Sequence, residues 1–179
     1  MSTPKNGHVN GFITIGYLHS FLSYDKKTGH FYWKPRANMP RRCYPAFKAG
    51  KPAGGIRANG YWYVTVDGKS YLASRLAHFY VTGFWPAADI DHHNRDTADN
   101  KWKNLRSATR SQNMANAKRF CTNKTGFKGV DYVVAKKKYR ATMTVNYKTV
   151  FLGYFDSAEK AAKARNAFAQ KTHGNFARL

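Results

Sequence analysis

Side chains alternate between apolar and polar from Tyr139 to Val145, and this alternation limits the possible folds more than any other feature of the chain. A period of two is typical of a β-strand that buries one face. A second strand is predicted at 149–155 after a turn at 146–148, and Ser157 is a suitable N-cap for a helix with an alanine-rich face. The pattern therefore predicts a small antiparallel sheet packed on a helix.

Upstream of this sheet, the sequence predicts short helices and hairpins. The Asp67-Gly68 pair is typical of a tight hairpin turn, and Gly83 is placed to end a short helix. The predicted helices span 13–23, 75–82 and 110–118, and the predicted strands span 24–34 (a hairpin), 61–66, 69–73, 89–94 and 104–106. Together with the C-terminal sheet, these elements predict a mixed α+β fold.

A polar joint at 120–124 separates two parts of the chain with different patterns. We expect a flexible N-terminus at residues 1–14, a first domain at 15–120 and a second domain at 121–179. The 179 residues are enough for two small domains with separate cores.

The chain is strongly basic, with 31 Lys and Arg residues, 9 Asp and Glu residues and a formal net charge of +22. Nucleic acid is the leading partner for such a chain, because each neutralised phosphate releases counterions. Aromatic residues make up 16% of the chain, whereas a disordered basic tail would lack them. No apolar run is long enough to span a bilayer, and no basic amphipathic helix with a wide apolar face favours a membrane surface.

Cys43 and Cys121 are the only cysteines, and they lie far apart in the sequence. They provide neither a disulfide framework nor the paired thiolates of a zinc knuckle, so we expect no structural zinc. A reducing, cytoplasmic setting is the default expectation for such a chain.

The stretch from Asp89 to Asn116 contains the densest group of chemically useful side chains. A phosphodiester hydrolase needs a cation, a base and a rigid scaffold that holds both at one phosphate. Asp91 and Asn113 offer hard oxygen ligands for Mg²⁺, and a neutral His92 can accept a proton near pH 7. Because neighbours on a regular strand point to opposite faces, Asp91 and His92 are expected at a bent strand end.

This stretch resembles the HNH (ββα-metal) endonucleases, in the branch found in phage and intron-encoded homing enzymes. The matching motif residues are Asp91, His92, Asn94, Asp99, Asn100, Asn104, Leu105, Arg106, Gln112 and Asn113. The upstream segments YDKKTGHFYWK and GYWYVTVDGKSYLASRLAHFYVTGFWP stand in the family's usual order, so the resemblance covers about residues 15–118.

The resemblance implies a role for each motif position that it covers. Asp91 and Asn113 would bind a divalent metal, Mg²⁺ or Mn²⁺. His92 would be the general base, and Asn104 would be the central Asn that hydrogen-bonds across the turn. Asn113 stands where many family members have the final His, and the alternative is that it is an Asn on the helix surface.

Two positions depart from the family pattern. Ser74 precedes Arg75 where a His-Arg pair is common, and His78 stands where the family usually has Trp. Ser74 has no imidazole, so a phosphate or metal role at that position is not carried over. Arg75 stays a candidate for gripping the cleaved phosphate, and Arg106 is a second candidate for contact with DNA.

Other polar residues of the stretch are expected to be structural. His93 is expected to be a neighbour of the site without a catalytic role. Asp96, Asp99 and Asn100 are expected to form turns rather than to bind metal.

The segment 125–179 resembles the plant ethylene-response-factor DNA-binding domain through GFKGV, YRATMTV, FLGYFDSAEKAAKA and HGNFARL. The resemblance implies three antiparallel strands packed on one helix, with the sheet in the major groove of double-stranded DNA. Asp131 stands near a position at which plant members often have Arg, so the plant target sequence cannot be carried over.

The strand pattern separates the two faces of this sheet independently of the resemblance. The side chains expected to face the helix are those of Tyr139, Ala141, Met143 and Val145. The outward side chains expected to read bases are those of Arg140, Thr142, Thr144, Thr149 and Phe151. The side chains expected to contact phosphates are those of Lys128, Lys136, Lys137, Lys138 and Lys148.

Two functions are compatible with these patterns. The first is a site-specific DNA endonuclease held on its target by the C-terminal module; cutting both strands would need a homodimer or two visits, since one site cuts one strand at a time. The second is a DNA-binding protein or transcriptional regulator with a degenerate nuclease site, which Ser74 favours and the intact motif residues disfavour. RNA binding suits the charge and the aromatic content but does not explain the ordered Asp-His and Asn positions.

Overall fold

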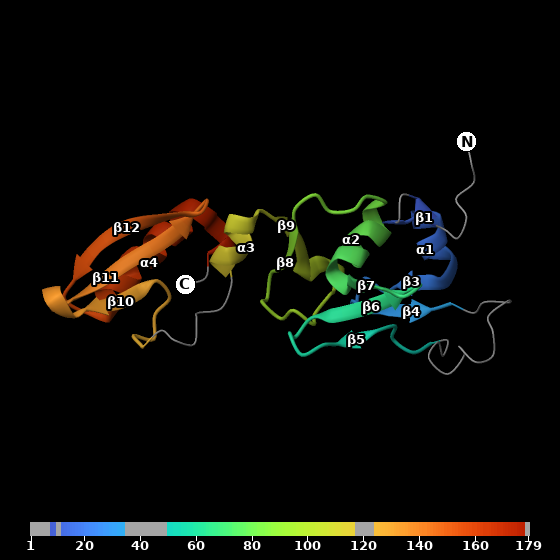
Figure 1. The fold of residues 1–179 in the computed structure, drawn as a ribbon, viewed down its shortest axis with the longest axis horizontal. Coiled ribbons are helices and arrows are strands. Elements are labelled where there is room, and N and C mark those ends of the chain that lie inside the picture. Colours follow the sequence, from blue (N-terminus) through green and yellow to red (C-terminus); the bar gives the residue numbers. More distant parts are fainter. Residues whose placement is uncertain (1–7, 10–11, 35–49, 117–123, 178–179) are drawn as a thin grey trace. The chain divides into compact units, whose positions relative to one another are not determined.

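The computed structural model describes residues 8–9, 12–34, 50–116 and 124–177, and the chain divides into two compact units, Met1–Ser107 and Ala108–Leu179. Several small sheets and four α-helices make up the described parts, which confirms the predicted mixed α+β class (Figure 1). Among these residues, no helix combines the length and the apolar character needed to cross a membrane.

The first unit starts with a short strand pair and one helix. The strands are β1 (His8–Val9) and β2 (Phe12–Ile13), and the helix is α1 (Ile15–Phe21). The strand pair lies within residues 1–14, for which the sequence predicts a flexible segment; residues 1–7 and 10–11 lie outside the described part. Thr14 caps α1 by accepting a hydrogen bond from the Tyr17 N–H at 3.3 Å. The helix predicted at 13–23 is therefore present but shorter.

Two further sheets follow α1 in this unit. The first consists of β3 (Leu22–Tyr24) and β4 (Phe31–Trp33), and the second of β5 (Gly55–Ile56), β6 (Trp62–Val66) and β7 (Lys69–Leu72) in that order. Asp67 and Gly68 form the β6–β7 turn with φ values of 48° and 78°, as the Asp-Gly pair predicts.

Helix α2 (Ala73–Thr82) packs on β6 and β7, and it ends at Gly83, whose φ of 80° is the left-handed conformation of a helix C-cap. Its core side chains meet those of α1 and the hairpins in one cluster. The largest fully buried members of this cluster are Phe21, Phe31, Ile13, Leu18, Leu22, Leu76, Val64 and Val66. This core holds the N-terminal hairpin beside the elements that follow α2.

Strands β8 (Asp89–His92) and β9 (Leu105–Ala108) form a two-stranded sheet after α2. A polar loop and the short 3-10 helix η3 (Trp102–Asn104) connect them. Both strands were predicted in this order, with ends that differ by a few residues because the connection tightens into a helical turn before β9.

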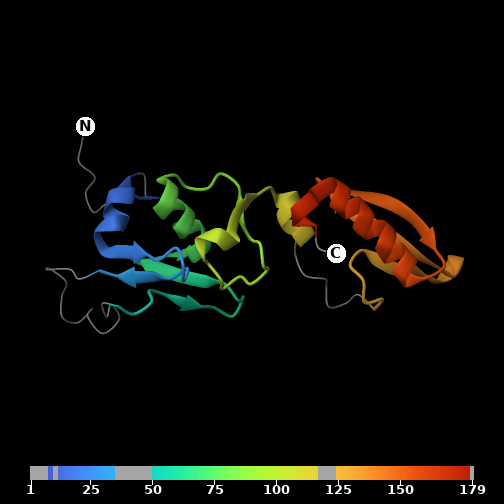
Figure 2. The same cartoon turned by 180° about the vertical axis from the view of Figure 1, so that it is seen from behind.

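The described part of the second unit contains a three-stranded sheet, two α-helices and two short 3-10 helices. Its elements are α3 (Arg110–Asn116), β10 (Val130–Val133), η4 (Val134–Lys136), β11 (Lys138–Val145), β12 (Lys148–Phe155), α4 (Ala158–His173) and η5 (Gly174–Phe176). The sheet is antiparallel with β11 at its centre, and α4 lies across one face of it (Figure 2). Ser157 caps α4 as predicted, by accepting from the Lys160 N–H at 3.2 Å.

The alternation in β11 is present as the sequence predicts. Ala141 and Met143 are buried on the side of α4, whereas Arg140 and Thr144 are exposed on the other side. The small side chains of α4 let the helix approach the sheet closely, since Ala141 packs in one cluster with Ala158, Ala161 and Ala162.

Helix α3 belongs to the second unit, although the sequence places it in a domain that ends at residue 120. Ala115 of α3 is buried in a cluster with Met143 and Ala169, and the Lys128 ammonium donates to the carbonyls of Met114 and Ala115 at 2.9 Å each. These contacts join α3 to the sheet and α4, so the chain divides after Ser107. The expected boundary between 120 and 121 lies outside the described residues.

Candidate active site and nucleic-acid interface

Asp91 and His92 are the last two residues of β8, and each is only 4% exposed. The strand ends at His92, and the chain turns at once, with the Arg95 N–H donating to the His92 carbonyl at 2.9 Å and Arg95 at a φ of 67°. The sequence predicts this bent strand end. An acid and an imidazole that are consecutive in the sequence are thus both buried at the end of one strand.

The Asp91 carboxylate is bound by Arg106, which lies on the paired strand β9. The guanidinium approaches Asp91 Oδ2 with Nε at 2.9 Å and Nη2 at 2.8 Å. A buried carboxylate needs such a charged partner, because desolvation of an unpaired charge is costly. Arg106, expected to contact DNA, therefore has a contact inside the protein that fixes the orientation of Asp91.

The His92 ring is oriented by Asn100. Nε2 of the imidazole lies 3.2 Å from Asn100 Oδ1, while the Asn100 amide nitrogen donates to the Ala98 carbonyl at 3.0 Å. Because the amide nitrogen is used in this way, the amide oxygen faces Nε2 of the ring. This contact favours the tautomer in which Nε2 donates, and in that tautomer Nδ1 is the nitrogen that can accept a proton.

Asn100 is itself held by the N-terminal hairpin. The Tyr24 hydroxyl donates to the Asn100 carbonyl at 2.6 Å, and both groups are buried. Burial and the nearby Asp25 and Asp99 carboxylates raise the pKa of Tyr24 above its usual range, so its hydroxyl stays a donor. Gly29 lies so close to the Asn100–Lys101 peptide that a Cβ there would overlap it. Only glycine therefore fits at position 29 of the hairpin turn, directly against the backbone of Asn100, the residue that orients His92.

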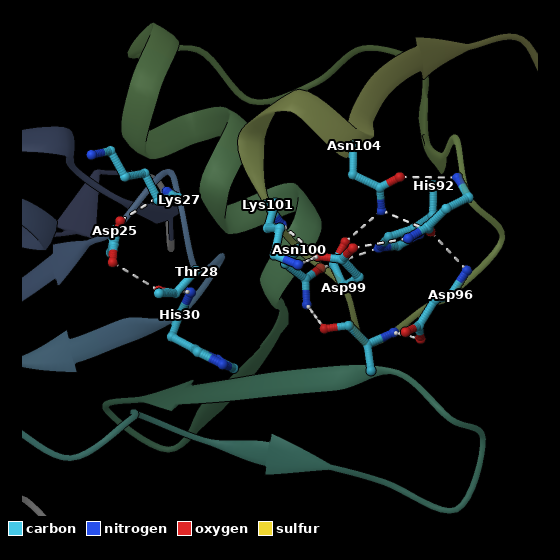
Figure 3. A network of polar contacts seen from close by, with 12 residues as sticks. Asp25, Lys27, Thr28, His30, His92, Asp96, Asp99, Asn100, Lys101 and Asn104 are labelled. Atoms are coloured by element: carbon cyan, nitrogen blue, oxygen red, sulfur yellow. Dashed lines mark hydrogen bonds and ion pairs between the residues drawn. The ribbon is translucent and has the colours of Figure 1, made fainter.

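Asn104, the last residue before β9, holds the loop between β8 and β9 through the hydrogen bonds of its side chain (Figure 3). Its amide oxygen accepts from the Asn94 N–H at 2.9 Å, and its amide nitrogen donates to Asn94 Oδ1 at 2.9 Å and to the Asp99 carbonyl at 2.7 Å. The side chain thereby makes the hydrogen bonds across the turn that the sequence predicts.

The acidic residues of the loop form turns. The Ala98 N–H donates to Asp96 Oδ1 at 3.0 Å, and the Lys101 N–H donates to Asp99 Oδ1 at 3.3 Å. Asp99 also accepts from the Asn94 amide at 2.8 Å. Asn100 lies in the same turn, as predicted, but its side chain also contacts the His92 ring. Residue types alone do not reveal this contact. The Asp-Asn pair of the motif is the signal in the sequence that marks the position.

Arg75 and Ser74, the residues at the family's His-Arg position, lie at the start of α2. The Arg75 guanidinium donates to the carbonyls of Pro86 and Ala88 at 2.9 and 3.1 Å, so it braces the segment that leads into β8. Ser74 is buried. The contact of Arg75 with a cleaved phosphate stays a prediction.

Asn113 lies in α3 of the second unit, where its N–H donates to the Thr109 carbonyl at 2.9 Å. The helix starts with a reciprocal cap, in which the Thr109 N–H donates to Gln112 Oε1 and the Gln112 N–H donates to Thr109 Oγ1. The role of Asn113 as a metal ligand stays a prediction. In the described part of the chain, His, Cys, Asp and Glu side chains do not gather in groups of three or more that could hold a metal ion.

The outward face of the C-terminal sheet carries charged, hydroxyl and aromatic side chains. Arg140 forms an ion pair with Asp131 on β10, and Thr144 and Thr149 lie opposite each other on β11 and β12. Phe151 is 54% exposed and lies 5.0 Å from the Tyr154 ring, measured between centroids. The predicted base-reading residues therefore share one accessible surface with aromatic rings.

The lysines predicted to contact phosphates differ in their surroundings. Lys136 stacks on Tyr154 with Nζ 4.2 Å from the ring centroid, and Lys138 pairs with Asp156 at 3.4 Å. Lys137 and Lys148 are exposed, whereas Lys128 holds the last carbonyls of α3. A cation at that position stabilises a helix C-terminus, which gives Lys128 a structural role beside the predicted one.

The segment that carries Asp91, His92 and Asn104 is also the segment that a known family matches. Residues 71–115 match the family model of HNH endonucleases. The match covers the end of β7, α2, the β8–β9 pair and all but the last residue of α3, so the HNH segment contains the candidate acid, base and central Asn. It supports nuclease activity and does not extend to residues 125–179. The comparison with curated proteins finds no match for the chain, and neither does the comparison with solved structures.

Proposed function

We propose that the chain is a divalent-metal-dependent DNA endonuclease in which His92 is the general base and the C-terminal unit holds the enzyme on DNA. The single observation that carries the proposal is the adjacent, buried Asp91 and His92 at the end of β8, inside the segment that matches HNH endonucleases. An imidazole that can act as a base and a carboxylate that can bind a cation, each fixed by its own partner, would meet the needs of phosphodiester hydrolysis.

His92 would take the proton from the attacking water through Nδ1. Asn100 supports this assignment, because its amide oxygen holds Nε2 as the donating nitrogen. Asn104 and the turn it organises keep β8 and β9 in register around the base, with the His93 N–H donating to the Asn104 carbonyl at 2.8 Å. The water would therefore meet a base whose orientation is set before substrate arrives.

The donors of this segment suit a hard divalent cation. Arg106 contacts Oδ2 of Asp91 and holds the carboxylate in one orientation, as a ligand must be held. Asp91 would bind the cation, and Asn113 is the second ligand that the family resemblance implies; Mg²⁺ and Mn²⁺ both accept carboxylate and amide oxygens. When bound, such a cation stabilises the charge that develops on the phosphate oxygens and on the leaving oxygen.

The C-terminal sheet would provide affinity for double-stranded DNA. Its outward face presents Arg140, Thr144 and Phe151 beside exposed lysines, and the whole chain has a net charge of +22. If about six phosphates are engaged, the slope of log K against log salt should be roughly −5. A flat salt response would contradict this electrostatic anchoring.

The resemblance to phage and intron-encoded enzymes extends the proposal to a homing-type nuclease that cuts at a specific site in the cytoplasm. One such site cuts one strand at a time, so cleavage of both strands would proceed through a homodimer or two successive visits. Sedimentation of the protein on a short duplex that contains its cleavage site distinguishes the two routes.

A plasmid-nicking assay tests the proposed activity. Parent protein should nick supercoiled DNA with Mg²⁺ or Mn²⁺, and EDTA should stop it. His92→Ala should lower the rate by about 10²- to 10⁴-fold with little effect on DNA binding, because a general base contributes that much. His93→Ala is the matched control, since His93 is exposed and adjacent, and it should retain the parent rate. Equal rates for the parent and His92→Ala would overturn the assignment of the base.

A non-cleaving DNA-binding protein is the second candidate, because Ser74 replaces the usual His and is buried at the start of α2. Footprints on duplex DNA without any nicking across Mg²⁺, Mn²⁺, Ca²⁺ and Zn²⁺ would favour this candidate. Ser74→His then serves as the diagnostic variant, since a gain of nicking would identify this position as the cause.

A further inference from the structure

Asp131 and Arg140 form a two-point ion pair on the outward face of the C-terminal sheet. They lie directly opposite each other on β10 and β11, with Nε to Oδ1 at 3.2 Å and Nη2 to Oδ2 at 2.9 Å. The Asp131 side chain is 46% exposed and the Arg140 side chain 45%, so the pair is reachable from solvent. The guanidinium is therefore held in one plane while remaining open to a partner.

The Asp131 carboxylate occupies one edge of the Arg140 guanidinium and leaves the end of the group open to another acceptor. Arginine has five N–H donors, and this pair uses Nε–H and one N–H of Nη2. The end of the group, formed by Nη1 and the second N–H of Nη2, presents two parallel donors. Two neighbouring acceptors in one plane can meet that edge.

The other neighbours of Arg140 limit where this edge can point. Tyr154 lies opposite Arg140 on β12 and is covered by the Lys136 ammonium, 4.2 Å from its ring centroid. Asp131 on one flank and Tyr154 on the other confine the guanidinium to the middle of the sheet face. An arginine held in advance loses less conformational freedom when it binds than a mobile one does.

We propose that Arg140, held by Asp131, reads a guanine in the major groove of double-stranded DNA through its O6 and N7 atoms. This inference rests on the proposed anchoring of the enzyme by the C-terminal sheet. Guanine O6 and N7 are the acceptor pair that an arginine end meets in the major groove. The Asp131 carboxylate argues against a phosphate at the same edge, because the pair has no net charge and the carboxylate repels an anion.

Selection of bound sequences from a pool of random duplexes tests the inference with four proteins. The full-length parent should enrich sites that contain a fixed guanine. Arg140→Lys keeps the charge but lacks the planar fork, and it should weaken the preference at that position. Asp131→Ala should also weaken the preference while total affinity stays equal or rises. Asp156→Ala is the matched control, because it removes a more exposed acid of the same unit that pairs with Lys138, and the guanine should persist.

A base analogue then identifies the contact at the selected position. Replacing the guanine with 7-deazaguanine removes N7 and should weaken parent binding by about tenfold, in keeping with the discrimination of a two-point arginine contact. The same replacement should weaken binding by Arg140→Lys clearly less, because a lysine lacks the two parallel donors that meet O6 and N7 together. Melting curves of the variants show whether the sheet is intact.

The outcomes separate this inference from the proposed function. Binding by the parent without any guanine preference, or an equal response of the parent and Arg140→Lys to 7-deazaguanine, overturns the inference and leaves DNA anchoring in place. Asp131→Ala and Asp156→Ala could gain the same DNA affinity and both retain the guanine preference. That result overturns the role of Asp131. Failure of the parent to bind any duplex overturns both the anchoring and the inference.

Discussion

The hydroxyl of Tyr24, in the first hairpin, donates to the backbone carbonyl of Asn100, which is 76 residues further along the chain. Asn100 in turn faces the His92 ring with its amide oxygen. The orientation of the candidate base is therefore set by a hairpin that lies outside the segment 71–115 matched by the family. The chemistry of the site depends on the packing of the N-terminal elements as well as on the motif.

Asn100→Ala should lower the nicking rate by about 10- to 100-fold, because the base keeps its identity but loses the partner that fixes its donating nitrogen. Single-turnover nicking measures the effect, and DNA affinity should not change. Asn59→Ala is the control, since Asn59 is an exposed Asn of the same unit that bonds to Tyr63. Parent-like nicking by Asn100→Ala would refute the orienting role.

Gly29→Ala should destabilise the first unit by about 2–4 kcal/mol, from the strain of a left-handed alanine and the overlap of its Cβ with the Asn100–Lys101 peptide. Gly68→Ala shares the positive φ, at +78° against +79°, but its Cβ would meet open space. It should therefore cost only the strain, about 1 kcal/mol. Denaturant unfolding followed by Trp fluorescence compares the two, and equal losses would argue against the close approach.

Arg106→Ala should destabilise the protein by about 3 kcal/mol, because it leaves the buried Asp91 carboxylate without its charged partner. Lys101→Ala breaks a more exposed ion pair with Asp99, 3.6 Å long, and should cost less than about 1 kcal/mol. Chemical unfolding of both variants measures the contrast. The affinity of Arg106→Ala for Mn²⁺ reports whether Asp91 keeps its orientation. An unchanged free energy of unfolding in Arg106→Ala would show that the ion pair does not stabilise the strand end.

His173 should make the second unit less stable in mild acid. Burial, with Arg165 and Lys128 nearby, lowers the pKa of His173 in the folded state from its ordinary 6.5. The unfolded chain therefore binds a proton first as the pH falls through about 6.5, and stability decreases below that pH. The melting temperature of the unit should fall between pH 7.5 and 5.5, and His173→Gln should flatten this dependence. An equal slope in both proteins would locate the titration elsewhere.

Local signals in the sequence predict much of the fold because they act over a few residues. Asp67-Gly68 forms the expected hairpin turn, Gly83 ends α2, Ser157 caps α4, and the alternation in β11 gives the expected buried and exposed faces. The motif spacing also brings Asp91 and His92 to a bent strand end. Each of these features depends on backbone geometry that neighbouring residues determine.

Contacts between distant segments could not be predicted in the same way. Lys128 carries the sequence signature of a phosphate contact, and its ammonium also donates to the carbonyls of Met114 and Ala115 in α3. Arg106 and Arg140 likewise carry the signature of DNA contacts, and each also meets a carboxylate on a neighbouring strand that the sequence does not reveal. The residue type gives the charge of a side chain, whereas its ion-pair partner depends on which strands pair in the folded protein.

The Asn104 side chain uses its oxygen once and its nitrogen twice, all within the loop between β8 and β9. Aspartate has the same shape but no donors, leucine has the bulk but neither donor nor acceptor, and glutamine is one methylene too long for the same three bonds. Random mutagenesis with selection for a folded protein should therefore return asparagine at position 104 almost every time, even where the surrounding loop accepts many other residues.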